Sequence, residues 1–252
     1  MIRRLLIISL AAGFLQLVSA REFQEEFSRA NNFYQQGEYE NALEIYNQII
    51  ETGFESGGLY YNLGNTYYKL NNIGLSRLYY ERARRFLKND QALDTNIRLL
   101  KLRLVDKIQT PPRFILSVWR DSLLETFSMN LLSWLTAGFL WLLLITAAVR
   151  QYFLKRRRVD RFKYFLVTAG ALFVICTLLF SQKIYYAETE KYGVILEPSV
   201  TLYAEPSDKG TEVFILHEGT KVKIERDNKE WLEIKLEDGK TGWIDKTYLE
   251  MI

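Results

Sequence analysis

Two long runs without a charged residue constrain this chain more than any other feature of its sequence. One run lies between Glu125 and Arg150, and the other lies between Lys163 and Lys183. A helix rises about 1.5 Å per residue, so each run can cross roughly 30 Å of hydrocarbon. A buried core helix is the alternative, but two such runs in 252 residues favour transmembrane helices over residues 127–149 and 164–182.

The segment between the two runs is short and strongly basic. Residues 150–163 hold seven Lys or Arg residues against one acidic residue, and four of the seven are consecutive: Lys155, Arg156, Arg157 and Arg158. Short loops rich in Lys and Arg stay on the cytoplasmic side of a membrane. We therefore expect a cytoplasmic loop, with both flanking regions outside. Because this topology already explains the charge, we expect no nucleic-acid partner.

The N-terminal segment, residues 1–20, also predicts export. Arg3 and Arg4 precede an apolar stretch that begins at Leu5 and ends in the small residues Ser19 and Ala20. This pattern is typical of a signal peptide. An uncleaved anchor helix is the alternative, and it would leave Arg21 on the same side of the membrane. Both alternatives agree with the basic loop, and they place the chain in the bacterial cytoplasmic (inner) membrane with its soluble regions on the periplasmic side.

Side chains suited to catalysis are nearly absent. His217 and Cys176 are the only histidine and cysteine, so no disulfide can form within the chain. Cys176 lies inside the second apolar run, where a small buried hydrophobe is expected rather than a thiolate. No pair of carboxylates stands out for acid and base chemistry. We therefore expect no enzyme activity, no metal site and no cofactor.

Residues 21–107 repeat themselves with a period of about 34 residues, at helical spacing and without proline. Aligning residues 23–56 on residues 57–90 matches small with small and aromatic with aromatic positions: Ala30 with Gly64, Phe33 with Tyr67, Tyr34 with Tyr68, and Tyr46 with Tyr80. The segments Gly37–Leu43 and Leu59–Leu70 resemble the tetratricopeptide repeat. This resemblance implies two pairs of antiparallel helices, and residues 92–106 then form a capping helix.

The same resemblance implies a concave face that binds a partner protein or peptide. Its expected residues are Asn31, Tyr34, Gln35, Tyr61, Asn62, Asn65, Tyr68, Lys69, Asn96 and Arg103. The family's carboxylate clamp is not expected, because Phe27, Ala92 and Asn96 occupy its basic positions. Alternatively, these side chains only pack and solvate the module. Two repeats are fewer than such stacks need, so support from a partner, the membrane or self-association is expected.

From Tyr192 onwards the pattern alternates, in short runs separated by turn residues. The runs cover residues 194–196, 201–203, 213–216, 221–224, 231–235 and 242–244. Residues 202–207, 217–222 and 238–244 resemble the bacterial SH3-like domain, which implies a small all-β barrel over residues 192–252. Related domains bind peptidoglycan or peptides, or only pack on a neighbour. We expect Tyr203 and Tyr248 as exposed contacts, Trp231 and Trp243 in the core, and a structural role for His217.

The order of these segments resembles the BatE family of bacterial aerotolerance operon proteins. An all-α repeat module precedes a linker and interfacial segment (residues 108–126), then two transmembrane helices and an all-β SH3-like barrel. The resemblance implies membrane partners that contain von Willebrand factor A domains, and a MoxR-type ATPase. The expected function is a membrane-anchored scaffold for envelope proteins. The alternative is a protein that binds or senses the cell wall through the barrel.

Overall fold

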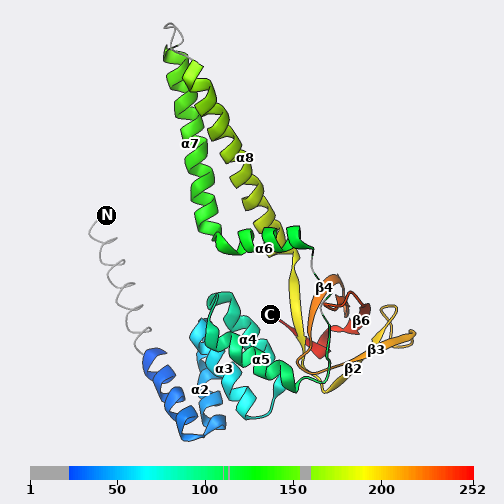
Figure 1. Cartoon of the computed structure of the whole chain (residues 1–252). Helices are drawn as coiled ribbons and strands as arrows, with labels where there is room; N and C mark the ends of the chain where they lie inside the picture. Colours follow the sequence, from blue (N-terminus) through cyan, green and yellow to red (C-terminus); the bar gives the residue numbers. More distant parts are fainter. Residues whose placement is uncertain (1–22, 110, 113, 154–159) are drawn as a thin grey trace, which may run out of the picture. The chain divides into compact units, whose positions relative to one another are not determined.

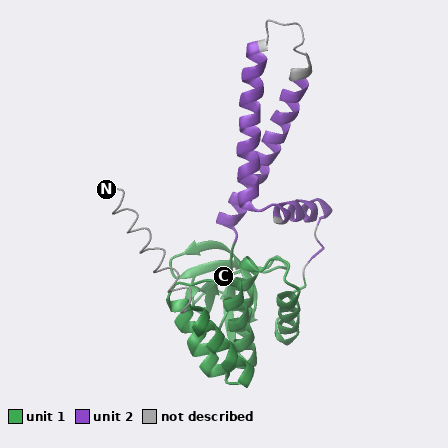
Figure 2. Ribbon diagram, turned by 90° about the vertical axis from the view of Figure 1, so that its left-hand side faces the viewer, with its two compact units in different colours: residues 1–110, 191–252 green, residues 111–190 purple. Residues whose placement is uncertain are grey.

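The computed structural model describes residues 23–109, 111–112, 114–153 and 160–252, which form two compact units. The first unit joins residues from both ends of the chain, up to Thr110 and from Lys191 to Ile252, and the second spans Pro111–Glu190 (Figure 2). The predicted signal peptide and the four consecutive basic residues Lys155, Arg156, Arg157 and Arg158 lie outside the described residues.

Among the described residues, five helices form the N-terminal part of the first unit, which we call the helical module (Figure 1). A helix over residues 23–36 is followed by α2 (Tyr39–Glu51), α3 (Gly57–Lys69), α4 (Ile73–Phe86) and α5 (Gln91–Arg103). Polar side chains begin three of these helices, since Ser56, Asn72 and Asp90 each accept a hydrogen bond from the backbone N–H three residues later. Such caps satisfy donors that a helix start leaves free.

The core of the helical module follows the period of the sequence repeat. Ala30, Tyr46 and Tyr80 are buried together with the leucines and isoleucines of the facing helices. Gly64 lets α3 and α4 approach closely, because a Cβ atom there would lie only 2.4 Å from the ring of Tyr80. The turns repeat as well: Gly37 and Asn71, at equivalent positions of the two copies, both adopt a positive φ after a helix. Asparagine tolerates this conformation better than most residues, so it replaces glycine in the second turn.

A seven-stranded antiparallel sheet forms the C-terminal part of the first unit, and we call it the sheet domain. Its strands are β1 (Lys191–Ile195), β2 (Ser199–Tyr203), β3 (Glu212–His217), β4 (Lys221–Asn228), β5 (Trp231–Lys235), β6 (Thr241–Asp245) and β7 (Leu249–Met251). They pair in the order β3-β2-β6-β5-β4-β1-β7, and a short 3-10 helix, Lys246–Tyr248, precedes β7.

Alternation along the strands decides which side chains enter the core of this sheet. In β5, Leu232 and Ile234 are buried, and in β6 Ile244 is buried. Successive side chains of a strand point to opposite faces, so Trp231 and Trp243 lie on the other face and are only half-buried. The prediction that these two tryptophans belong to the core is therefore wrong.

The helical module and the sheet domain meet in a packed contact that we call the joint. Gly74 of α4 packs against the backbone of Ile195 and Leu196, and its N–H donates to Glu218 at 3.3 Å. Arg82 of α4 donates to the Glu250 carboxylate and to the Met251 carbonyl, both at 2.9 Å. These contacts join segments that lie far apart in the sequence, so side-chain and backbone contacts between α4 and the sheet hold the first unit together.

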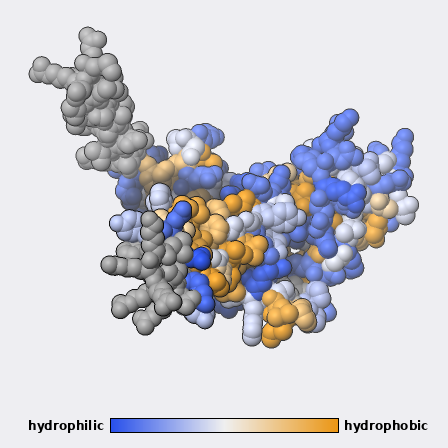
Figure 3. All heavy atoms as spheres, turned by 90° about the horizontal axis from the view of Figure 1, so that it is seen from above, coloured by the Kyte–Doolittle hydropathy of each residue, from blue (hydrophilic) through white to orange (hydrophobic). Residues whose placement is uncertain are grey.

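The second unit contains α6 (Ile115–Thr126), α7 (Met129–Phe153) and α8 (Asp160–Thr189), and α7 packs along α8 as a hairpin (Figure 1). Within the described residues, two helices are long and apolar enough to cross a membrane: Met129–Tyr152 and Lys163–Thr189. Both carry exposed apolar side chains, among them Trp141, Leu144 and Leu178. Apolar side chains gather in an orange patch in Figure 3, flanked by hydrophilic ones.

The predicted linker before the first apolar helix is largely helical. Helix α6 exposes Trp119 and other apolar side chains, and the Lys183 amine of α8 donates to the carbonyl oxygens of Leu124 and Phe127 at its end. The guanidinium of Arg120 also lies 5.3 Å from the ring centre of Tyr186 on α8. A lysine is well placed there, because the last carbonyls of a helix lack partners within it and carry partial negative charge.

Candidate functional site

A cleft of about 700 Å³ opens where several strands of the sheet domain end. The pairing of Trp231 with Asp245, and of Tyr203 with Trp243, brings the end of β2, the start of β5 and the end of β6 together. The loop after β2 and the 3-10 helix complete the walls. The lining residues are Glu197, Ser199, Val200, Thr201, Tyr203, Pro206, Ser207, Asp208, Glu230, Trp231, Asp245 and Tyr248.

Aromatic rings form one part of the lining. Tyr203 and Trp231 meet edge to face, with ring centres 5.8 Å apart and an interplanar angle of 81°. Tyr248 lines the same cleft and is 41% exposed. Such rings offer rigid apolar area and a polar edge, so they bind sugars and peptide backbones at a low cost in conformational entropy.

Carboxylates form the other part of the lining. Glu197, Asp208, Glu230 and Asp245 contribute four acidic side chains, and the described residues of the lining include no lysine, arginine or histidine. The hydroxyl and the N–H of Thr247 both donate to Asp245, which lowers the pKa of that carboxyl below its ordinary value. Near neutral pH the cleft therefore presents negative charge beside aromatic rings, a combination that attracts cationic groups.

Residues 198–250 match the bacterial SH3 domain family. The match covers six of the seven strands and contains eleven of the twelve residues that line the cleft, so we call the sheet domain the SH3 domain from here on. No curated protein matches the chain. Among solved structures, an NlpC/P60 family protein from Bacillus cereus ATCC 10987 is 18% identical, with a TM-score of 0.22. That alignment covers 28% of this chain and 23% of the other, so the chain spans about a quarter of the length of that protein.

The sequence predicts Tyr203 and Tyr248 on the surface of the SH3 domain, and the structure brings both into the cleft. Sequence reasoning misses Trp231, whose size suggests a core position. The alternation of β5 is the signal that could have found it, because Leu232 and Ile234 already fill the buried positions of that strand. The four carboxylates are also missed, since they come from separate loops and strand ends.

The asparagines predicted for the concave face of the helical module bond to one another. The Asn31 side-chain oxygen accepts from the Tyr46 hydroxyl at 2.6 Å and from the Asn62 amide at 2.7 Å. This oxygen therefore already has two donors, which is what a carbonyl oxygen can accept.

The same pattern recurs in the second copy of the repeat. There the Asn65 oxygen accepts from the Tyr80 hydroxyl at 2.7 Å and from the Asn96 amide at 2.8 Å. Asn96 also donates to the Tyr61 hydroxyl at 2.9 Å. Burial raises the pKa of Tyr80, and it raises the pKa of Tyr46 to about 12, so both hydroxyls keep their protons near neutral pH. The asparagines thus stabilise the packing of the helices through hydrogen bonds between neighbouring helices.

The remaining predicted residues of this face are the tyrosines and basic side chains. Arg103 lies over the ring of Tyr68, 5.0 Å from its centre, and donates to the Asn71 oxygen. Tyr34 meets Tyr39 edge to face, and Lys69 is exposed at the end of α3. The structure therefore brings these side chains to partly exposed positions, but their contacts are mainly with one another.

Metal ligation finds no support in the part of the chain that the structure describes. No group of three or more His, Cys, Asp or Glu side chains there could hold an ion. Cys176 lies buried in α8, and His217 is engaged at the joint, where its ring Nδ1 lies 2.9 Å from the Asp106 carboxylate.

Proposed function

We propose that this protein is anchored in a bacterial membrane and binds peptidoglycan through the cleft of its SH3 domain. The observation that carries the proposal is the cleft itself, in which Tyr203, Trp231 and Tyr248 lie among four carboxylates. Bacterial SH3 domains commonly bind peptidoglycan, and the family match covers this cleft. The proposal assigns a binding role and no catalytic step.

The chemistry of peptidoglycan suits such a cleft. Its glycan strands offer apolar sugar faces that stack on aromatic rings, and its peptides carry free amino groups wherever they are not cross-linked. A positively charged amine gains from both a carboxylate and an aromatic face at close range. The proposed ligand is therefore a peptide segment of the wall with a free amine, together with its adjoining sugar.

The proposed membrane anchor is the hairpin of α7 and α8. Each helix is long and apolar enough to span the hydrocarbon layer. The predicted cytoplasmic position of the basic loop, residues 150–163, would put the SH3 domain on the outer side, where peptidoglycan is found. Sidedness is testable with thiols introduced by Arg157→Cys and Asp208→Cys, in a chain whose Cys176 is replaced by alanine. An impermeant reagent should label only the second.

Co-sedimentation of the full chain in mild detergent with purified peptidoglycan tests the proposed ligand. We expect Tyr248→Ala and Tyr203→Ala each to weaken binding roughly tenfold, because each removes a ring from the cleft. Ile215→Ala is the matched control, since Ile215 is exposed on β3 and lies outside the cleft. Binding that is absent, or equally strong in all three variants, would rule the cleft out as a peptidoglycan site.

A second candidate function is a scaffold in which the helical module binds an envelope protein. The partly exposed rings of Tyr34, Tyr61 and Tyr68 on the predicted concave face favour it, because tyrosine beside arginine is common at protein interfaces. The tetratricopeptide assignment and a Bat-type complex, with von Willebrand factor A domain partners, belong to this candidate. Photo-cross-linking in intact cells from position 68 should capture a protein that position 44, exposed on α2, does not.

A further inference from the structure

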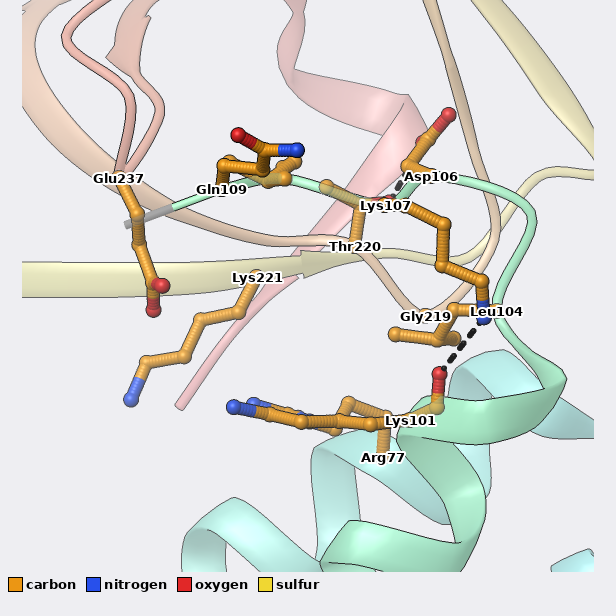
Figure 4. Close-up of a pocket in the computed structure, with 11 residues that line it drawn as sticks. Arg77, Lys101, Leu104, Asp106, Lys107, Gln109, Gly219, Thr220, Lys221 and Glu237 are labelled. Atoms are coloured by element: carbon orange, nitrogen blue, oxygen red, sulfur yellow. Dashed lines mark hydrogen bonds between the residues drawn. The ribbon is translucent and has the colours of Figure 1, made fainter. Parts of the chain in front are cut away.

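A second pocket, of about 250 Å³, lies at the joint between the helical module and the SH3 domain. Arg77 of α4 and Lys101 of α5 line it from the helical side, and the segment from Leu104 to Gln109 adds a further wall. Gly219, Thr220, Lys221 and Glu237 line it from the SH3 domain. Figure 4 shows the side chains of both modules around this space.

Arg77 is the most unusual side chain of the pocket. Only 3% of the residue is exposed, and its Nη2 lies 2.7 Å from the Glu81 carboxylate. Among the residues that the structure describes, the other two guanidinium nitrogens, Nε and Nη1, have no hydrogen-bond partner. Buried donors are almost always paired in proteins, so an arginine with two unpaired nitrogens beside a pocket points to a missing acceptor.

Positive charge exceeds negative charge around this arginine. The Glu81 carboxylate is shared, because Lys221 donates to it at 2.8 Å while Arg77 contacts its other oxygen. Lys101 and Lys107 add two further cations to the lining. Both of these lysines are exposed, and the Lys107 amine already donates to the carbonyls of Lys101 and Leu102, at 3.1 and 3.0 Å. The buried Arg77, with its two unpaired nitrogens, is therefore the group that makes this pocket attractive to an anion.

The two remaining carboxylates of the pocket compensate for this charge only in part. Asp106 is turned to the SH3 domain, where it accepts from the His217 N–H and from the Thr220 hydroxyl, both at 2.7 Å. Glu237 lies in an exposed turn, and its negative charge favours the charged form of the Arg77 guanidinium. Together with Glu81, these make three carboxylates against four cations, Arg77, Lys101, Lys107 and Lys221, so one positive charge remains in excess.

We propose that this pocket binds the phosphate group of a small phosphorylated compound. A phosphate is a dianion with oxygens in several directions, so it can meet Arg77 from one side and lysines from others. A carboxylate has one charge and two oxygens in a plane, and it fits four surrounding cations less well. The volume, below that of a typical drug-sized site, suits a phosphate with a small substituent.

Because the pocket walls come from both modules, the phosphate would connect α4 and α5 to the turn before β4. Binding should therefore stabilise the joint, since a ligand that binds only the closed arrangement favours it by mass action. This site is separate from the cleft that is proposed for peptidoglycan, and the two share no residue.

Calorimetric titration of the full chain in mild detergent tests the proposal, with inorganic phosphate as the probe. We expect saturable binding with a Kd at or below about 1 mM. Acetate at the same ionic strength should bind at least tenfold more weakly. Absence of saturable phosphate binding up to about 50 mM, or equal binding of acetate, would overturn the assignment of this chemical class.

Variants locate the binding in the pocket. Lys101→Ala should weaken phosphate binding about tenfold, and Arg77→Met should abolish it, whereas the control Lys88→Ala should not change it. Since Arg77→Met removes a buried ion pair and can unfold the joint, Lys101→Ala, on an exposed side chain, keeps the test valid. Phosphate binding that survives both pocket substitutions would show that the site lies elsewhere.

Two sources of the phosphate group can be separated in the same assay. Short-chain phosphatidic acid represents a lipid headgroup, and glycerol 3-phosphate represents a soluble metabolite of the same chemistry. Binding of the lipid at least tenfold tighter than glycerol 3-phosphate would assign the pocket to a headgroup, and similar affinities would assign it to a soluble compound. Both results require sensitivity to Lys101→Ala; without that sensitivity the proposal fails.

Discussion

Asp106 shows how one carboxylate can connect two modules. It follows α5 in the sequence, yet its partners are the His217 and Thr220 groups of the SH3 domain. Burial by itself would raise the pKa of Asp106, but the hydrogen bonds from Thr220 and His217 outweigh it and hold that pKa below its ordinary value of 3.8. The ionised form is therefore the one that stabilises the joint.

Replacing Asp106 by asparagine should weaken the joint by about 1–3 kcal/mol at pH 7, because an amide cannot accept all of these hydrogen bonds. A folded-state pKa below the unfolded one gives stability that is present above about pH 4 and lost as pH falls further. The difference between Asp106→Asn and the native chain should therefore shrink below pH 4. The rate of amide hydrogen exchange in residues 212–224 measures this difference in stability.

Asp208→Asn is the control, because Asp208 lines the cleft of the SH3 domain and is not among the residues of the joint. It should leave exchange in residues 212–224 unchanged at every pH. A difference between Asp106→Asn and the native chain that stays constant from pH 7 to pH 3 would show that the carboxylate is not held ionised by these bonds.

At the scale of elements, the helical module depends on two small residues in α3 that differ in their surroundings. Gly64 faces α4, where an added Cβ would lie 2.4 Å from the Tyr80 ring. Gly58, earlier in the same helix, has no neighbour closer than 3.8 Å to the same added atom. One glycine is therefore needed for close packing, while the other is not.

Gly64→Ala should lower the free energy of unfolding by about 1–2 kcal/mol, since overpacking outweighs the gain in helix propensity. Gly58→Ala should be neutral or slightly stabilising, because only the propensity term remains. Thermal unfolding followed by far-ultraviolet circular dichroism compares the two. If Gly64→Ala melted at the same temperature as Gly58→Ala, the close approach of α3 and α4 would be wrong.

The periodic parts of these elements were predictable from the sequence. The register of the repeat puts Ala30 with Gly64, and Tyr46 with Tyr80, at equivalent positions, and all four are buried. Periods are local properties, so a single chain displays them. The function of the asparagines was not predictable in this way, because the Tyr46 and Tyr80 hydroxyls that use their oxygens come from the following helix.

At the scale of the whole molecule, the first unit combines residues from before and after the apolar helices. Its joint contains a nearly buried group of charges, in which Glu81, 3% exposed, lies between Arg77 and Lys221. Burial raises the pKa of Glu81, but the two cations outweigh it and keep that pKa low. No sequence period reports such a contact, since Glu81 and Lys221 are 140 residues apart.

Glu81→Ala should destabilise the first unit by about 3–5 kcal/mol, because it leaves Arg77 buried without its counter-charge. The loss should appear in both modules, so amide exchange should accelerate in α4 and in β1 together. Glu44→Ala, at an exposed position of α2, is the matched control and should leave amide exchange in both α4 and β1 unchanged. Faster exchange confined to α4 would show that the two modules unfold independently.

The contacts of Arg82 with Glu250 and Met251 have a consequence for biosynthesis. A ribosome delivers the helical module first and residue 250 some 168 positions after Arg82, when both apolar helices have been made. The face of α4 that meets the SH3 domain therefore stays uncovered while the intervening apolar helices are synthesised. At this stage a nascent chain would need a chaperone to cover α4. A chain whose translation stops before Glu250 would lack the partner of Arg82 and would leave this face of α4 uncovered.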